Sequence, residues 1–428
     1  MLNERKQQRR IRRDRRRERR KVHANPYVHR LLRYIARRVL LAVFRVETVD
    51  RELINRASGP FILMGNHSSV IDPFIVGVFV NKPIHYVVSD SQFRSRLLSW
   101  VLGLAGSIPK TKVMSDLDTV KKIIAVKSAG GVIGIFPEGQ SSWDGHNLPI
   151  VRATDKLVKS LKIPVYIARI EGAYLSWPRW ARRPRRGRIR ITFERLFTGD
   201  DLKSLPVTAV GERLETALAV DAFEFQNLAG YTYRGPRLAE YLERILFVCP
   251  GCSRIGTLRS HRRRVSCTSC GHSVLFNNRG FFEPRRGPVR FETVREWNLW
   301  QMDQFAERLD TLTAATTADT VLLEEPDVII REGFKTQPLK TLGNATMTLY
   351  RDQLVLSLRE GIRIELPLRA VEGINVQNNE HLEFYAFMNL YRISTASPRG
   401  NTFKWDFAVR RLQGKAILNA TRESTADT

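Results

Sequence analysis

Four short apolar runs in the first half of the chain alternate with segments of helical spacing. The runs cover residues 61–64, 86–88, 132–136 and 165–168. Their shortness, bounded by turn residues, predicts buried strands rather than helices. One of the intervening helices is expected to open at Asp72-Pro73, with Asp72 as its N-cap. Repeated strand–helix units predict an α/β domain over residues 26–235, with a mixed sheet and flanking helices.

The chain changes to a β-rich pattern over residues 310–415. Closely spaced runs of strand-forming residues lie at 346–350, 354–358, 362–366 and 390–393. They predict the short strands of a small barrel or sandwich, and residues 403–412 are expected to form a helix that caps it. Several strands followed by a helix that bears Trp405 resemble a pleckstrin-homology (PH) or related lipid-binding domain. A generic β-sandwich is the alternative.

Residues 31–43 carry apolar side chains at helical spacing, with Leu31, Ile35 and Val39 on one stripe and arginines between them. This pattern is typical of a basic amphipathic helix, which either lies in a bilayer interface or packs on the domain as a surface helix. No stretch reaches the roughly 18 uninterrupted apolar residues that a membrane-spanning helix needs. Any contact with a membrane is therefore expected to be peripheral.

The chain has 428 residues, which suits two or three domains, and a formal net charge of +27. Such an excess indicates an anionic partner, which is a membrane surface, a nucleic acid or an anionic substrate. Residues 1–25 are a basic arm in which like charges repel and predict disorder. The arm would suit anionic lipid or nucleic acid, or it is a solvated tail without a specific partner.

All four cysteines fall in two Cys-x-x-Cys pairs inside the segment 245–280. The pairs are Cys249 with Cys252, and Cys267 with Cys270. This spacing predicts a zinc ribbon, in which four thiolates surround a structural Zn²⁺ and leave no open position for catalysis. The alternative is four reduced cysteines without a metal. The basic loop between the pairs lacks interleaved stacking aromatics, so nucleic acid is not the expected partner.

His67 follows the first predicted strand, and loops at strand ends commonly display functional groups. Asp72 lies five residues later, a separation that lets a tight turn return its carboxylate to the imidazole. A carboxylate on one ring nitrogen fixes the tautomer and leaves the other nitrogen to act as a general base. The pair alone is ambiguous, because a structural His and an Asp-Pro helix cap are both common.

Two further segments are expected to reach the same edge of the sheet. Residues 136–139, Phe-Pro-Glu-Gly, follow the third predicted strand, and open α/β sheets bind ligands at their carboxyl edge. Residues 106–112 place Lys110 and Lys112 in one short turn, which suits a phosphate group. Residues 163–165, Ile-Pro-Val, open the fourth predicted strand.

In this order and spacing, these segments resemble the four motifs of the glycerophospholipid acyltransferase family, which includes lysophosphatidic acid acyltransferases. The resemblance covers about residues 45–195. It implies that His67 deprotonates a glycerol hydroxyl and that Asp72 orients His67. The alkoxide would attack the thioester of an acyl-CoA or acyl carrier protein, without a covalent acyl-enzyme. The implied ligands of the phosphoglycerol head group are Lys110, Lys112, Glu138 and Gly139.

The chain departs from the family pattern at the head-group motifs. The family usually has Thr-Arg-Ser after Phe-Pro-Glu-Gly, so Ser141 stands where a phosphate-contacting Arg is usual. The second motif usually carries an Arg, where this chain offers lysines, which bind phosphate as point charges rather than as forks. Candidates for the missing charge are Arg152 and the cluster Arg182, Arg183, Arg185 and Arg186. A membrane-facing basic patch is the alternative role for that cluster.

The expected function is transfer of a fatty acyl group from acyl-CoA or acyl carrier protein to the free hydroxyl of a lysophospholipid like 1-acyl-glycerol-3-phosphate, in phospholipid biosynthesis. The protein is expected to be cytoplasmic and peripheral on the inner face of the cell membrane, with an anionic membrane surface as partner. The alternative is a catalytically silent adaptor that binds membrane or nucleic acid through its basic arm and zinc ribbon.

Overall fold

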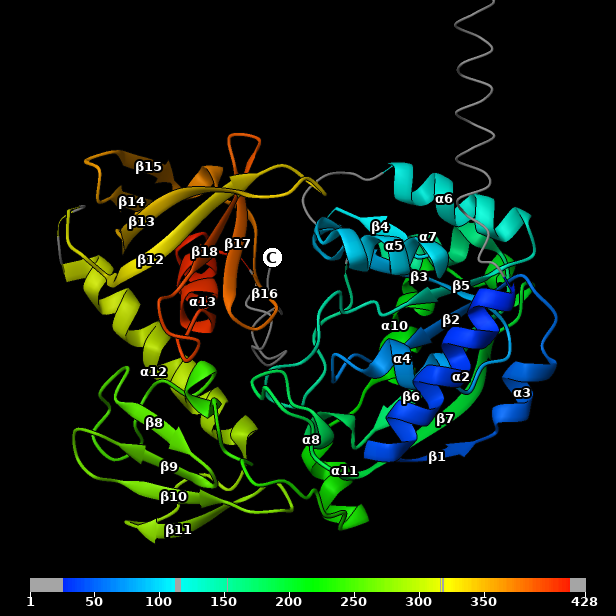
Figure 1. The fold of residues 1–428 in the computed structure, drawn as a ribbon, viewed down its shortest axis with the longest axis horizontal. Coiled ribbons are helices and arrows are strands. Elements are labelled where there is room, and N and C mark those ends of the chain that lie inside the picture. The colour runs from blue at the N-terminus through cyan, green and yellow to red at the C-terminus, as the bar shows by residue number, and fades with distance from the viewer. Residues whose placement is uncertain (1–25, 112–116, 152, 316, 318, 416–428) are drawn as a thin grey trace, which may run out of the picture. The chain divides into compact units, whose positions relative to one another are not determined.

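The computed structural model describes residues 26–111, 117–151, 153–315, 317 and 319–415 (Figure 1). The chain forms two compact units whose segments alternate along the sequence. Unit 1 comprises Met1–Ser141, Pro149–Ala173 and Arg188–Val220, and unit 2 comprises Ser142–Leu148, Tyr174–Gly187 and Asp221–Thr428. The basic arm over residues 1–25 lies outside the described residues. Its disorder and the domain boundaries expected from the sequence stay predictions.

Unit 1 is built on a seven-stranded mixed sheet with the order β1-β7-β6-β2-β5-β3-β4. The strands are β1 (Arg45–Val49), β2 (Phe61–Gly65), β3 (Ile84–Ser89), β4 (Ile108–Lys110), β5 (Val132–Ile135), β6 (Val165–Glu171) and β7 (Arg188–Phe197). Strands β4, β3, β5, β2 and β6 are all parallel, and β7 runs antiparallel to β6. Every residue of β2 is buried, as expected of a central strand covered on both faces. The five parallel strands therefore end at one edge of the sheet.

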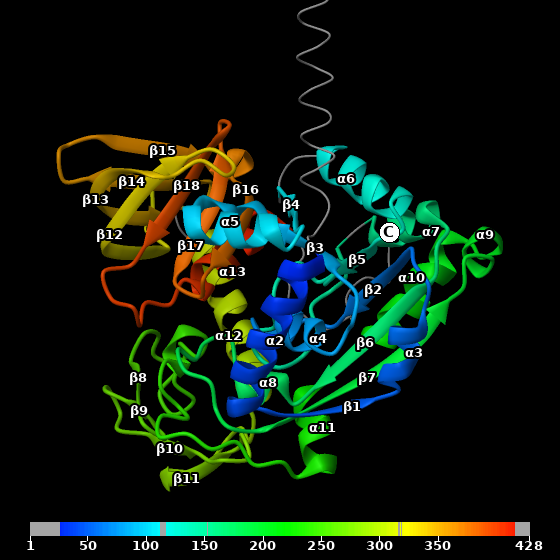
Figure 2. The ribbon, with the colours of Figure 1, turned by 45° about the vertical axis from the view of Figure 1, so that its right-hand side comes forward.

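Helices flank this sheet as predicted. They are α2 (Pro26–Val43), α3 (Arg51–Arg56), α4 (Asp72–Gly77), α5 (Arg96–Leu104), α6 (Leu117–Ser128), α7 (Thr154–Leu161), α9 (Asp201–Ser204) and α10 (Val207–Leu218), with the 3-10 helix η1 (Asp90–Arg94). Helix α6 packs on β4 and β5, α10 packs on β6 and β7, and α2 lies along α4 (Figure 2). Ile62, Met64 and Ile133 of the sheet share an apolar cluster with Ile123 of α6 and Val158 of α7. None of the described helices combines the length and apolarity needed to span a bilayer.

Unit 2 contains a four-stranded antiparallel sheet with the order β11-β10-β9-β8. The strands are β8 (Leu258–His261), β9 (Arg264–Cys267), β10 (Ser273–Phe276) and β11 (Phe282–Arg286). The helices that precede it along the chain are α8 (Ala173–Ser176), which begins at the unit boundary, α11 (Ala222–Ala229) and the 3-10 helix η2 (Leu242–Arg244). Helix η2 contacts β8, so the segment that leads into the first cysteine pair packs on this sheet.

Unit 2 also contains a seven-stranded antiparallel sheet with the order β15-β14-β13-β12-β18-β17-β16. The strands are β12 (Leu323–Gly333), β13 (Lys340–Leu349), β14 (Gln353–Leu358), β15 (Arg363–Pro367), β16 (Glu372–Gln377), β17 (His381–Ala386) and β18 (Asn389–Ser394). The remaining helices are α12 (Val294–Ala315), η3 (Leu368–Ala370) and α13 (Phe403–Leu412), the last of which contacts β16, β17 and α12. The predicted β-rich segment with a closing helix over residues 403–412 is confirmed.

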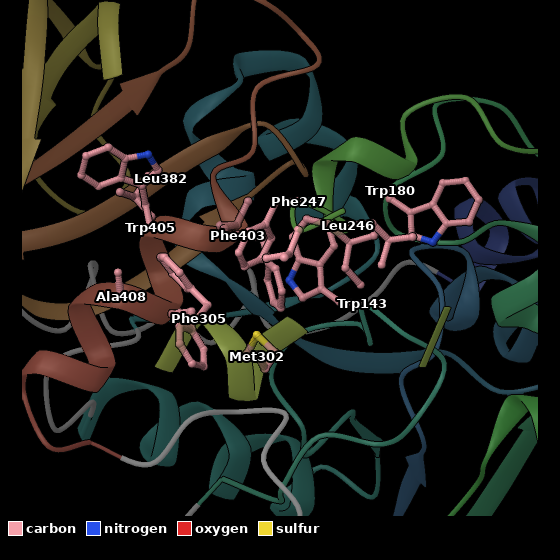
Figure 3. Packing of buried hydrophobic residues seen from close by; sticks show 14 of the residues in the cluster. Trp143, Trp180, Leu246, Phe247, Met302, Phe305, Leu382, Phe403, Trp405 and Ala408 are labelled. Carbon is pink, nitrogen blue, oxygen red and sulfur yellow. The ribbon is translucent and has the colours of Figure 1, made fainter. Parts of the chain in front are cut away.

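Large aromatic side chains fill the core of unit 2 (Figure 3). The ring centroids of Trp143 and Phe403 lie 5.2 Å apart, and those of Phe247 and Phe305 lie 5.1 Å apart. Trp405 is fully buried in the same cluster. Each such ring removes about 150–250 Å² from water, so these contacts dominate the packing. One continuous core therefore joins the four-stranded sheet, α12 and the seven-stranded sheet.

Candidate active site

Strand β2 leads the chain to the carboxyl edge of the sheet in unit 1, where Asn66 follows it. Asn66 is fully buried. Its Nδ2 donates to the carbonyl of Ile170 at 2.9 Å, and its Oδ1 accepts from the N–H of Ile170 at 2.7 Å. These two bonds tie the end of β2 to β6 and fix the backbone that carries His67. No role was predicted for Asn66, although a polar amide between a buried strand and the candidate base is a usable signal.

His67 and Asp72 meet as the sequence predicted. Nδ1 of His67 lies 3.0 Å from Oδ2 of Asp72, and the same oxygen accepts the N–H of Ser69 at 2.7 Å. The Asp72 side chain is fully buried, whereas 17% of the His67 side chain is exposed. An ionised carboxylate only accepts hydrogen bonds, so Nδ1 carries the proton. Nε2 makes no hydrogen bond within the described part of the chain, which leaves it as the proton acceptor.

Asp72 is not the N-cap of α4, so that prediction was wrong. Ile71 occupies the N-cap position, and no side chain caps the helix. Asp72 is the first helical residue, and its carboxylate turns toward Ser69 and His67 instead. The physical reason is that the carboxylate is occupied by the loop before the helix, where it contacts the imidazole of His67 and accepts the N–H of Ser69.

The carboxylate of Asp72 lies in surroundings of low polarity. Burial raises its pKa, and the hydrogen bonds from His67 and Ser69 lower the pKa only in part. Among the described residues, Oδ1 of Asp72 and the phenol of Tyr86 are buried without a hydrogen-bond partner. Burial and the charge of Asp72 also raise the pKa of Tyr86, so this phenol stays protonated. In such a site a carboxylate stabilises a neighbouring imidazolium more strongly than it would in water.

Strand β5 brings Glu138 to the same edge of the sheet. The N–H of His67 donates to Oε1 of the buried Glu138 at 2.7 Å. Gly139 has a φ of +73°, a conformation that favours glycine, and its N–H closes a turn on the carbonyl of Phe136 at 3.1 Å. Glu138 therefore holds the backbone of His67, in addition to the head-group role that the resemblance implies.

The ring of Phe136 packs against the imidazole of His67, with 4.9 Å between the ring centroids. Gly65 allows this approach, because a Cβ at position 65 would come within 2.9 Å of the Phe136 ring. The ring of Phe136 also stacks on that of Tyr86, with 5.9 Å between the ring centroids. Two residues without a sequence-assigned role, Gly65 and Phe136, thus position the candidate base.

Lys110 ends β4, where it pairs in register with Ser89 of the parallel strand β3. It therefore lies at the same edge as His67 and its side chain is exposed, but β4 is three strands from β2 in the sheet order. At about 4.8 Å between neighbouring strands, the two sites are separated by roughly 14 Å. Lys110 is thus positioned to contact a different part of a substrate from the part that lies at His67. Lys112 lies outside the described residues.

The residues considered as replacements for a phosphate-contacting arginine differ in their surroundings. Ser141 is buried, and Arg152 lies outside the described residues. Arg185 is buried in unit 2, where its guanidinium donates to the carbonyl of Leu175 at 3.1 Å. Arg185 is therefore a packing residue of unit 2 and not a phosphate ligand. The exposed members of its cluster are Arg182, Arg183 and Arg186.

The four cysteines of unit 2 gather into one cluster, with their sulfur atoms all within 4.8 Å of one another. The sulfur atoms of Cys249 and Cys270 lie 3.7 Å apart, and those of Cys252 and Cys267 lie 3.8 Å apart. A tetrahedral ion with Zn–S bonds of about 2.3 Å requires sulfur separations of about 3.8 Å. The donor set therefore fits a four-coordinate metal ion and leaves no open coordination position.

The comparison with family models matches a segment that lies mostly in unit 1. The Acyltransferase family model matches residues 45–171. Over 125 residues the chain is 28% identical to the 1-acyl-sn-glycerol-3-phosphate acyltransferase of Saccharomyces cerevisiae, a match that covers 28% of this chain and 41% of that protein. Over 124 residues it is 20% identical to the chloroplastic 1-acyl-sn-glycerol-3-phosphate acyltransferase BAT2 of Brassica napus, covering 28% and 36%. The chain thus spans less than half the length of these relatives.

Among solved structures, the 1-acyl-sn-glycerophosphate (LPA) acyltransferase PlsC of Thermotoga maritima aligns with a TM-score of 0.41 and 17% sequence identity. The alignment covers 47% of this chain and 80% of that structure. The segment matched by the family model contains His67, Asp72 and Glu138. This chain thus contains a segment, residues 45–171, that matches the Acyltransferase family model, and over part of its length it is similar to glycerophospholipid acyltransferases.

Proposed function

We propose that this protein transfers a fatty acyl group from the thioester of acyl-CoA or acyl carrier protein to the free hydroxyl of a lysophospholipid. The observation that carries the proposal is the contact of 3.0 Å between His67 Nδ1 and the buried Asp72, beside the ring of Phe136. This arrangement suits a general base and the carboxylate that orients it. The match of residues 45–171 to the Acyltransferase family model supports the same reaction, as does the similarity of the chain to 1-acyl-sn-glycerol-3-phosphate acyltransferases.

In the proposed reaction, Nε2 of His67 accepts the proton of the acceptor hydroxyl as its oxygen attacks the thioester carbonyl. The tetrahedral intermediate then expels the thiolate, which takes the proton from the imidazolium. Asp72 keeps the proton on Nδ1 throughout and stabilises the imidazolium. No acyl group is transferred to the protein in this scheme.

The acceptor is proposed to be like 1-acyl-glycerol-3-phosphate, with Lys110, Lys112, Glu138 and Gly139 around its head group. Lys110 and Glu138 support this assignment because they share the carboxyl edge of the sheet with His67. Lysine presents a point charge, so a head-group site with lysines is expected to select an anionic head group less strictly than a site with an arginine fork. Ser141 is buried and carries no charge.

An acyl-transfer assay tests the proposed reaction. Purified protein is incubated with lysophospholipids that differ in head group, with acyl-CoA or acyl carrier protein as donor, and release of the donor thiol is followed. We expect thiol release that depends on the acceptor and is fastest with a phosphate-bearing lysolipid. Absence of transfer for every donor and acceptor pair would instead favour the catalytically silent adaptor.

We also propose that unit 1 meets an anionic membrane surface peripherally, at the inner face of the cell membrane. Leu31, Ile35 and Val39 of α2 are 50–60% exposed and lie among arginines. Helix α5 has no buried residue, and its Leu97 and Trp100 are exposed. Exposed apolar side chains flanked by basic residues favour insertion at a lipid interface.

Replacing Leu31 and Val39 together by glutamate should weaken binding to anionic vesicles more than tenfold, because each buried leucine or valine contributes about 1.5–3 kcal/mol. Vesicle flotation measures this binding. The control is Leu228→Glu on α11, since Leu228 is 91% exposed yet belongs to unit 2. Equal flotation of the double variant and the control variant would contradict the membrane role of α2.

We propose that the cysteine cluster holds a structural Zn²⁺ in a zinc ribbon formed with strands β8–β11. The sulfur separations of 3.7 and 3.8 Å support a closed tetrahedral site. Zinc would contribute folding free energy to unit 2 without taking part in acyl transfer.

Metal analysis of the purified protein is expected to find one zinc ion per chain. Cys249→Ser should lose that ion and lower the unfolding temperature, whereas Ser269→Ala, a change beside the ligand Cys270, should keep it. Zinc-free wild-type protein with four titratable thiols would contradict the zinc site.

We further propose that β12–β18 and α13 form a PH-like domain. Its support is the antiparallel order in which the long strand β12 pairs with both β13 and β18, together with the closing helix α13. An experimental structure in which β12 pairs on one side only would contradict it.

A further inference from the structure

A pocket of about 410 Å³ in unit 2 has three arginines and one tyrosine among its six lining residues. Its lining residues are Ala181, Arg182, Arg183, Arg237, Glu240 and Tyr241. All of them belong to unit 2, and none lies in the segment matched by the family model. A volume in this range accommodates a small ligand or a head group. The pocket is therefore a candidate site that the proposed acyl transfer does not use.

Tyr241 has an unusual backbone conformation within this pocket. Its φ of +74° lies in the left-handed region, which an aromatic residue rarely adopts and which neighbouring contacts must enforce. Its N–H donates to Ser260 Oγ at 2.8 Å. Three guanidinium groups surround its ring, with their Cζ atoms 4.5 to 5.6 Å from the ring centroid, and they belong to Arg182, Arg244 and Arg399. The pocket wall is therefore built before any ligand arrives.

The charges around Tyr241 do not balance. Arg399 pairs with the buried Glu243, and Arg237 lies 3.5 Å from Glu240. Glu380 is shared, because it lies 2.5 Å from Arg244 and 3.8 Å from Arg182. Arg183 has no ion-pair partner within the described ranges. Five guanidinium groups thus meet three carboxylates, which leaves two positive charges at the pocket.

We infer that this pocket binds a phosphate monoester group. A monoester carries about −1.5 to −2 charges at neutral pH, which matches the two positive charges left at the pocket. Arginine forks bind phosphate oxygens in pairs, and Arg183 and Arg237 are exposed on the pocket wall. The ligand is either the head group of a phosphorylated lipid or a soluble phosphate ester, since both present the same group.

The pocket suits a phosphate monoester better than a nucleic acid. Single-stranded nucleic acids bind through aromatic faces on which successive bases stack. Tyr241 is the one aromatic residue of the pocket lining, and its ring is already packed among three guanidinium groups. A phosphodiester backbone also carries only one charge per phosphate, which would leave part of the surplus unmatched.

Titration calorimetry on the full-length chain, at fixed salt, tests this inference with two probes. Glycerol 3-phosphate is the soluble probe, and phosphatidylcholine vesicles doped with phosphatidate supply the lipid-borne monoester. We expect saturable binding of at least one probe. The probe that binds more tightly shows whether the phosphate monoester comes from a lipid or from a soluble ester. The double variant Arg183→Ala, Arg237→Ala should raise the Kd about tenfold to a hundredfold, because each lost charge-assisted hydrogen bond weakens binding.

Three variants make the test specific. Arg285→Ala removes an exposed arginine on β11, the sheet edge opposite β8, and should leave the Kd unchanged. Glu240→Gln removes a carboxylate from the pocket and should tighten binding. Lys110→Ala alters only the candidate head-group site of unit 1 and should also leave the monoester Kd unchanged at this pocket.

Two results would overturn the inference. One is that the double variant binds the monoester probes with the wild-type Kd. If Lys110→Ala raises the Kd instead, the binding belongs to unit 1. The other is an oligonucleotide that binds more tightly than both monoester probes and loses that binding in the double variant. Acyl transfer by the double variant is measured separately, so a failed pocket and a failed acyltransferase proposal remain distinguishable.

Discussion

His67→Ala is expected to abolish acyl transfer while the protein remains folded. The imidazole supplies the proton acceptor of the proposed reaction, and loss of a general base typically lowers a rate by about 10²–10⁴-fold. Most of the fold does not depend on this side chain, because the Asn66 bonds and the backbone bond from His67 to Glu138 remain. The measurement is the rate of donor thiol release at saturating acceptor, with circular dichroism as the check on folding.

His261→Ala is the matched control, because His261 is exposed on β8 in unit 2 and has no part in the proposed reaction. It should keep the wild-type rate. A His67→Ala protein that turned over at nearly the wild-type rate would show that another group accepts the proton, and the mechanism proposed above would be wrong.

Asp72→Asn is expected to lower the rate nearly as much as the histidine substitution. An asparagine keeps the shape of the side chain, and with its NH2 group in the place of Oδ2 it donates to Nδ1 of His67. The ring proton then moves to Nε2, which removes the base, and the N–H of Ser69 loses its acceptor at that position. In serine protease triads the equivalent change costs about 10⁴-fold. The measurement is kcat at saturating acceptor, with Asp118→Asn, an exposed carboxyl on α6, as the control.

The same substitution should make unit 1 more stable at neutral pH. Burial raises the pKa of Asp72 above its ordinary value of 3.8, so the folded state binds this proton more tightly than the unfolded state does. The carboxyl group therefore contributes most stability below that ordinary value, and the contribution is lost as pH rises through the folded-state pKa. An uncharged asparagine avoids this loss.

Thermal unfolding of wild type and Asp72→Asn across pH measures the effect. We expect the variant to unfold at a higher temperature near neutral pH, with the difference shrinking as the pH falls toward the ordinary carboxyl pKa. A variant that was less stable than wild type at neutral pH would mean that the bond to His67 outweighs the cost of burial. The transfer rate and the unfolding temperature of this variant would thus separate the contribution of Asp72 to catalysis from its effect on folding stability.

The sequence by itself determined the elements and their chemistry wherever the signal was local. The short, uninterrupted apolar runs in the sequence identified β2 and β5 as buried strands. A central parallel strand is covered on both faces, so its residues are apolar without alternation. The Cys-x-x-Cys spacing located the cysteine cluster, because each pair forms one short turn. The helix over residues 403–412 followed from the same kind of local pattern.

Tertiary structure alone decided the roles of groups whose partners are distant in sequence. Glu138 receives the N–H of His67 only because β5 lies beside β2, and Asn66 is satisfied only by Ile170 on β6. Arg185 belongs to a basic run, yet burial against backbone carbonyls removed it from the surface. Local sequence cannot report such contacts, because their free energy depends on strand order and burial, which are properties of the assembled sheet and core.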